Sequence, residues 1–190
     1  ENSVEKIAEK LTCWFFSKGI IREDQIQWCR YMIVHRSMNL ISLIWLIPVG
    51  SLVSEWYTSL AFVLSYRLLR SRTGGYHAQT PLGCLCIATL LQLSILSVIP
   101  YIASPIYLSP ALVVCSLVIV FFSPENSNSI HLSPAEIKAL GPQIKARLLM
   151  LWILSFGFSR VVPDIAISIS LGVIATGVLL IIPKTRIGVK

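Results

Sequence analysis

A histidine and a cysteine, separated by helix-breaking residues, are the part of the sequence best suited to chemistry. Cys84 follows His77 by seven residues. On one continuous helix their Cα atoms would lie roughly 10 Å apart, which is beyond hydrogen-bond reach. Gly75 and Pro81 interrupt such a helix, so the chain can fold back and bring the imidazole to the thiol. A thiolate formed in this way attacks carbonyl carbons, so the pattern predicts a Cys–His pair suited to acyl transfer.

The neighbours of Cys84 predict how its thiol is placed. Pro81 is typical of the first position of a helix, so Cys84 falls in the first turn. The partial positive charge of that helix end, together with Arg70 or Arg72, favours a thiolate. The backbone N–H groups of Gly83 and Cys84 are candidate donors to the oxyanion that forms when a carbonyl is attacked.

Plainer interpretations of the same residues stay open. A cysteine is often a small buried hydrophobe, and a histidine near arginines is often only solvated. A metal site is a weaker alternative, because His77, Cys84 and Cys86 offer three ligands where structural zinc takes four at other spacings. We therefore expect neither a metal nor a cofactor.

The composition indicates a membrane protein. Of the 190 residues, 55% are hydrophobic and only 13% are charged, whereas about a quarter of the residues in a soluble domain are charged. The net charge is +7, and the basic residues behind it are expected in cytoplasmic loops near the span ends. Because this placement accounts for the positive charge, no nucleic-acid partner is expected. Five cysteines with no visible secretory signal indicate free thiols rather than a disulfide framework.

Apolar runs predict an all-α polytopic membrane protein with about six transmembrane helices, some of them short or re-entrant. The predicted spans are two short ones within 38–69, separated at Glu55, followed by 82–99, 104–122, 148–162 and 165–182. A short polar helix that begins at Pro134 is expected to end at Gly141-Pro142. We expect 1–190 to form a single membrane-integrated domain, with 1–36 as its cytoplasmic or interfacial segment and 37–190 as its transmembrane core.

The N-terminal segment predicts an amphipathic helix over 3–18. Apolar residues recur at the spacing of one helix face, at Val4, Ile7, Ala8, Leu11, Trp14 and Phe15. Glutamates and lysines occupy the opposite face, which makes the segment too charged to span a bilayer. We expect a helix lying in the membrane interface, with a helix packed on the protein's own surface as the alternative.

Basic residues predict the orientation. They gather in 18–36, 67–72, 138–147 and 184–190, which all fall on one side of a six-span arrangement. Cytoplasmic loops near span ends collect Lys and Arg. Both termini and the loop 67–81 are therefore expected on the cytoplasmic side of the cell membrane.

The stretch "RSRTGGYHAQTPLGC" resembles the signature of the accessory gene regulator B family, the membrane endopeptidases of Gram-positive quorum sensing. The matching positions are Arg70, Gly74, Gly75, His77 and Cys84. The chain length, the predicted interfacial helix and the segment "FFSPENSNSIHLSP" also look like this family. Thr73 stands where the family often has Ser, which is a mild departure.

The resemblance implies a cysteine endopeptidase that removes the C-terminal tail of a short pro-peptide. The rest of the peptide is held as a thioester and leaves as a cyclic thiolactone or lactone. In this scheme Cys84 is the nucleophile and His77 is the general base. Positioning groups would be Arg70, Arg72, Gly74 and Gly75. The implied partners are a pro-peptide with an amphipathic leader and an acidic tail, the lipid bilayer and a second copy of the chain.

Two functions from other classes compete with this one. A small transporter would also be polytopic, but it would carry ionisable residues within its spans, and these are almost absent here. A non-enzymatic membrane assembly factor would need no loop thiol beside a broken helix.

Overall fold

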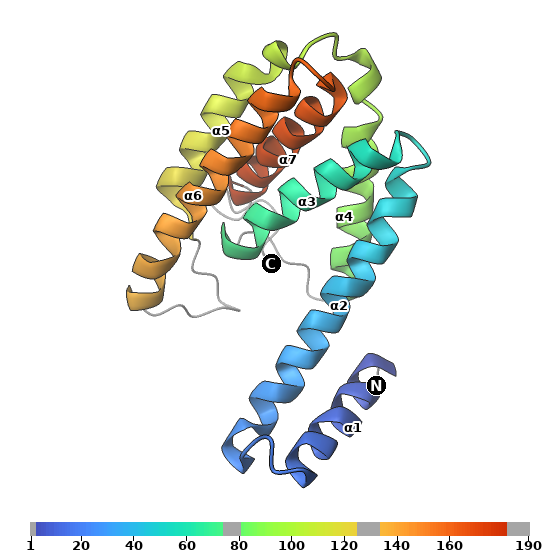
Figure 1. Ribbon diagram of the computed structural model, residues 1–190, viewed down its shortest axis with the longest axis vertical. Coiled ribbons are helices and arrows are strands. Elements are labelled where there is room, and N and C mark those ends of the chain that lie inside the picture. The colour runs from blue at the N-terminus through green and yellow to red at the C-terminus, as the bar shows by residue number, and fades with distance from the viewer. Residues whose placement is uncertain (1–2, 74–80, 125–133, 182–190) are drawn as a thin grey trace. The chain divides into compact units, whose positions relative to one another are not determined.

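The computed structural model describes residues 3–73, 81–124 and 134–181 of the chain. The predictions that concern Gly74, Gly75 and His77 fall outside the described residues. The α-helices are α1 (Ser3–Ser17), α2 (Ile26–Gly50), α3 (Trp56–Thr73), α4 (Pro81–Leu96), α5 (Ser109–Phe122), α6 (Pro134–Phe158) and α7 (Pro163–Ile181), shown in Figure 1. Short 3-10 turns are η1 (Glu23–Gln25), η2 (Ile99–Tyr101) and η3 (Pro105–Leu108).

The structure divides into two compact units, Glu1–Trp45 and Leu46–Lys190, and the division falls inside α2. The prediction that 1–190 form one functional domain stays a prediction.

The all-α polytopic membrane fold is confirmed. Within the described residues, four helical stretches are long and apolar enough to cross a membrane: Glu23–Gly50, Gly83–Tyr101, Pro105–Phe122 and Pro163–Ile181. The other two predicted spans correspond to α3 and to the C-terminal part of α6. Those two helices fall outside this set because three arginines lie near the end of α3, and two lysines and an arginine lie in the N-terminal part of α6.

The predicted break near Glu55 is confirmed, because α2 ends at Gly50 and α3 begins at Trp56. The first span begins earlier than predicted, since α2 already starts at Ile26 rather than near residue 38. A run of apolar residues locates only the hydrophobic part of a helix. The helix itself can begin earlier, in a polar first turn.

The prediction that Gly141-Pro142 ends a short helix is wrong, because α6 runs through both residues. A residue before proline normally avoids the helical conformation, since its Cβ clashes with the proline ring. Gly141 has no Cβ, so this clash is relieved. Ile144 and Leu148, one and two turns further on, are buried in the core, and this packing favours one continuous helix over two.

Helix α7 forms the centre of the second unit and packs against α3, α5 and α6 (Figure 1). Its small residues permit close approach. A Cβ added at Gly177 would lie 2.7 Å from Cβ of Cys115 on α5, and one added at Gly172 would lie 3.1 Å from the backbone nitrogen of Tyr66 on α3. These glycines therefore serve helix packing within the chain, as small residues do between membrane helices.

We expect Gly172→Ala to destabilise the protein by about 1–3 kcal/mol, the usual cost of overpacking a close-packed core. The new methyl group would collide with the hydroxyl of the buried Ser65 and press on the backbone of α3. Gly157→Ala is the matched control, because an added Cβ there meets nothing within 4 Å. Thermal unfolding in detergent, followed by circular dichroism, would measure both variants. Equal melting temperatures for Gly172→Ala and the unmodified protein would contradict the expectation.

A buried glutamine fixes the position of α4. The Gln92 side chain is 1% exposed, and its Nε2 donates to the carbonyl of Leu46 at 2.9 Å and to Oγ of Ser59 at 3.0 Å. These bonds join α4 to the end of α2 and the start of α3. Unsatisfied polar groups are costly in an apolar environment, so such bonds hold the three helices together.

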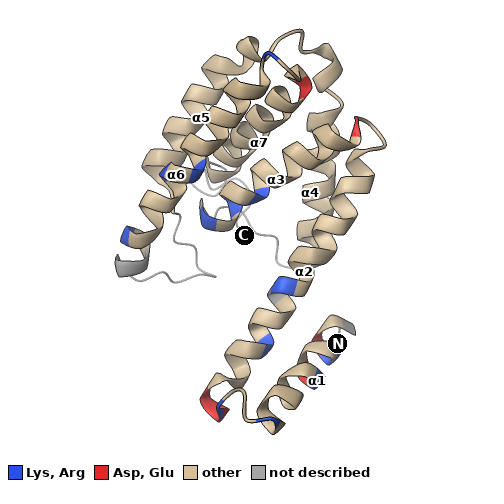
Figure 2. Ribbon diagram, viewed as in Figure 1, with Lys and Arg blue, Asp and Glu red and all other residues tan. Residues whose placement is uncertain are grey.

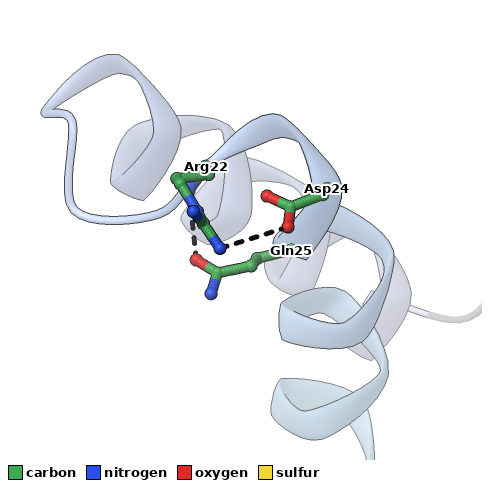
Figure 3. Close-up of polar contacts among 3 residues, drawn as sticks. All are labelled: Arg22, Asp24 and Gln25. Carbon is green, nitrogen blue, oxygen red and sulfur yellow. Dashed lines mark hydrogen bonds and ion pairs between the residues drawn. The ribbon is translucent and has the colours of Figure 1, made fainter.

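In the first unit, hydrogen bonds define the turn between α1 and α2 (Figure 3). The backbone N–H of Arg22 donates to Oε1 of Gln25 at 3.2 Å, and its guanidinium lies 3.4 Å from the carboxylate of Asp24. Beyond the turn, Arg30 of α2 lies 4.0 Å from the carboxylate of Glu9 on α1.

The predicted amphipathic helix over 3–18 is present as α1, but its apolar residues divide between two faces. Ala8 is buried, whereas Ile7, Leu11 and Trp14 are 58%, 41% and 52% exposed. Ala8 thus packs inside the unit, whereas the stripe formed by Ile7, Leu11 and Trp14 remains accessible. The location of this helix in the membrane interface stays a prediction.

Candidate active site

The thiol of Cys84 is exposed in the first turn of α4, as the sequence predicted. Pro81 is the first residue of this helix. Helix N-termini leave backbone N–H groups without intrahelical partners, and they carry a partial positive charge. A thiolate or an oxyanion formed at Cys84 would therefore lie in a favourable field.

The C-terminal end of α3 brings further groups to this thiol. A thiolate at Cys84 lies close enough to Tyr66 and Arg67 to interact with both electrostatically, and Arg70 acts on Tyr66 in the same way. The phenol ring of Tyr66 stacks on the ring of Phe62, with centroids 5.9 Å apart and planes 3° from parallel. The end of α3 is therefore both charged and aromatic where it neighbours Cys84.

Helix α6 adds another cation to the same end of α3. Nη1 of Arg147 donates to the carbonyl oxygen of Leu68 at 2.6 Å and to Oγ of Ser71 at 2.9 Å. Arg72 lies close enough to act electrostatically on Arg147. Figure 2 shows basic residues gathered at this end of α3 and on α6.

Comparison with known families gives a match to the model described as Accessory gene regulator B over residues 4–182. The chain belongs to the accessory gene regulator B family. This membership gives the chain a role in quorum sensing, in a family known for peptide processing. No curated protein and no solved structure matches the chain.

Four of the predicted site residues lie around the end of α3 and the start of α4. Arg70 and Gly83 are half-buried, whereas Arg72 and Cys84 are exposed. The roles assigned to these residues stay predictions.

Exposure alone does not distinguish the two cysteines of α4, because Cys86 is exposed like Cys84. Cys84 lies close enough to Tyr66 and Arg67 at the end of α3 to act on both electrostatically. The assignment of Cys84 as the reactive thiol of this accessory gene regulator B protein stays a prediction.

Sequence reasoning missed Tyr66, Arg67 and Arg147 as members of the site. A signal for the first two was present, because Tyr66 and Arg70 are one helical turn apart and Arg67 is next to Tyr66. No sequence signal pointed to Arg147, since it lies 79 residues from its acceptor Leu68. Only the packing of α6 on α3 brings these two together.

Proposed function

We propose that this protein is a membrane cysteine endopeptidase that cuts the C-terminal tail from a short quorum-sensing pro-peptide and cyclises the remainder. The observation that carries the proposal is the exposed thiol of Cys84, which lies at a helix N-terminus and beside the charged end of α3. The segment between α3 and α4 contains His77, whose imidazole supplies the base in this proposal.

In the first half of the reaction, His77 takes the thiol proton and the sulfur of Cys84 attacks the scissile carbonyl carbon. A C–S bond forms, and the carbonyl oxygen becomes an oxyanion that backbone N–H groups near Gly83 stabilise. The C–N bond then breaks with its electron pair going to nitrogen, which takes the proton from His77. The tail leaves with a free amine, and the rest of the peptide stays on the enzyme as a thioester.

In the second half, a thiol or hydroxyl inside the bound peptide attacks the same carbonyl carbon. The bond to the sulfur of Cys84 breaks, and the proton lost by the attacking group returns to the enzyme. Exchange of one thioester for another is nearly balanced in energy, so the activated bond survives in a thiolactone product. Water must be kept from the intermediate, and a site at the membrane boundary limits its access.

We propose three partners for the enzyme: the pro-peptide, the lipid bilayer and a second copy of the chain. The arginines at the end of α3 would attract an acidic peptide tail. The accessible stripe Ile7, Leu11 and Trp14 of α1 suits an amphipathic leader or the bilayer interface. The mass of the purified protein in detergent would test the dimer.

The alternative transporter function has less support. The candidate spans Gly83–Tyr101 and Pro105–Phe122 contain no Lys, Arg, Asp, Glu or His. A transport path through the membrane normally has ionisable residues along it.

We propose a cytoplasmic active site, and labelling with a membrane-impermeant thiol reagent tests this orientation. In a background without native cysteines, Lys138→Cys on α6 should resist the reagent in intact cells and react in inverted vesicles. Leu52→Cys, between α2 and α3, is the matched control and should react in intact cells. Both positions are exposed on the protein. Labelling of Lys138→Cys in intact cells would overturn the orientation, because basic segments predict that side to be cytoplasmic.

A further inference from the structure

We propose that Arg147 is a positioning residue for the reaction, because it holds the last turns of α3 so that Arg67 stays near Cys84. Nη1 of Arg147 reaches from α6 to two acceptors on α3, the carbonyl oxygen of Leu68 at 2.6 Å and Oγ of Ser71 at 2.9 Å. The inference rests on the proposed function, since it assigns Arg147 a role in that same site.

The two acceptors lie where they control the site. Leu68 directly follows Arg67 in the chain, and Ser71 directly follows Arg70. The guanidinium therefore bonds the backbone directly after Arg67, and it also bonds the hydroxyl of Ser71, which donates to the same Leu68 carbonyl at 3.2 Å. Because the bond to Leu68 is charge-assisted and lies near the negative end of the α3 dipole, it is stronger than an ordinary amide hydrogen bond.

The packing of α6 on α3 does not depend on this guanidinium. Leu69 of α3 and Ile144, Leu148 and Leu151 of α6 are buried in the same hydrophobic core. Loss of the two hydrogen bonds should therefore leave the helices together and loosen only the end of α3. This separation makes the role of Arg147 testable without unfolding the protein.

The test compares Arg147→Gln and Arg147→Lys with Lys145→Gln, a matched loss of positive charge at an exposed position two residues away on α6. Two measurements are made in detergent. One is kcat and KM for release of the tail from a synthetic pro-peptide. The other, without peptide, is the rate at which iodoacetamide alkylates Cys84 at neutral pH in a protein whose other cysteines are serine.

We expect Arg147→Gln to lower kcat by about 10- to 100-fold, the range in which small misplacements of reacting groups fall. KM should change by less than about threefold, because a positioning residue does not bind the peptide. Alkylation of Cys84 should slow as well, since Arg67 is no longer held near its sulfur. Arg147→Lys should recover part of both rates, and Lys145→Gln should match the unmodified protein.

Unchanged kcat and unchanged alkylation in Arg147→Gln would overturn the inference. So would a change confined to KM, which would make Arg147 a peptide-binding residue. If Arg147→Gln fails to fold, Ser71→Ala removes one acceptor and leaves α6 intact; unaltered rates in that variant would also overturn it. If Cys84→Ala still releases the tail, the proposed function is wrong. The rates at which Cys84 is alkylated in the Arg147 variants would then still show whether Arg147 positions the end of α3.

Discussion

Replacing Cys84 by alanine should abolish release of the pro-peptide tail, whereas replacing Cys86 by alanine should leave most of the activity. Both thiols are exposed on α4. Cys84 lies in the first turn of the helix and Cys86 does not, and Cys84 is close enough to Arg67 at the end of α3 to act on it electrostatically. Two residues along a helix turn a side chain by about 200°, so Cys86 cannot replace its neighbour.

The deciding measurement is mass spectrometry of each variant after incubation with synthetic pro-peptide. The unmodified enzyme should carry a thioester adduct on the fragment that contains Cys84, and Cys86→Ala should carry the same adduct. Cys84→Ser should bind the peptide without turning it over, because a hydroxyl needs a stronger base than a thiol does. An adduct on Cys86, or a tail released by Cys84→Ala, would show that the mechanism is wrong.

Loss of the imidazole at His77 is expected to lower the rate of tail release by about 10²- to 10⁴-fold, the usual worth of general acid–base catalysis. The enzyme would then lack the group that takes the thiol proton and returns it to the leaving amine. Alkylation of Cys84 at neutral pH should slow as well, because less of the thiol is ionised. The variant is His77→Ala, and the measurements are single-turnover cleavage and the rate of alkylation.

A matched control comes from a second histidine. The sequence places His131 in a polar segment with no cysteine nearby, so His131→Ala should cleave at the unmodified rate. Added imidazole should restore part of the activity of His77→Ala by supplying the missing base. A His77→Ala enzyme that cleaves at the unmodified rate would remove His77 from the mechanism.

Much of the fold could be predicted from local sequence. Runs of apolar residues indicated helices of membrane length, and the start of α4 at Pro81 and the break near Glu55 were correctly predicted. These features depend on composition and on the backbone chemistry of single residues, which act over one or two turns. The error at Gly141-Pro142 has the opposite origin. At these two residues, a Gly-Pro pair that normally ends a helix is outweighed by the burial of Ile144 and Leu148 further along α6.

The sequence by itself determined the class of the protein, the helix that carries Cys84 and the candidate partner His77. It did so because residue spacing and helix-breaking residues act within a short stretch of chain. Only the tertiary structure decided that Tyr66 and Arg67 neighbour the thiol and that Arg147 binds the end of α3. Contacts between helices far apart in the chain depend on which surfaces pack together, as in the core that Leu69 of α3 shares with Ile144 and Leu148 of α6. No local pattern of residues encodes it.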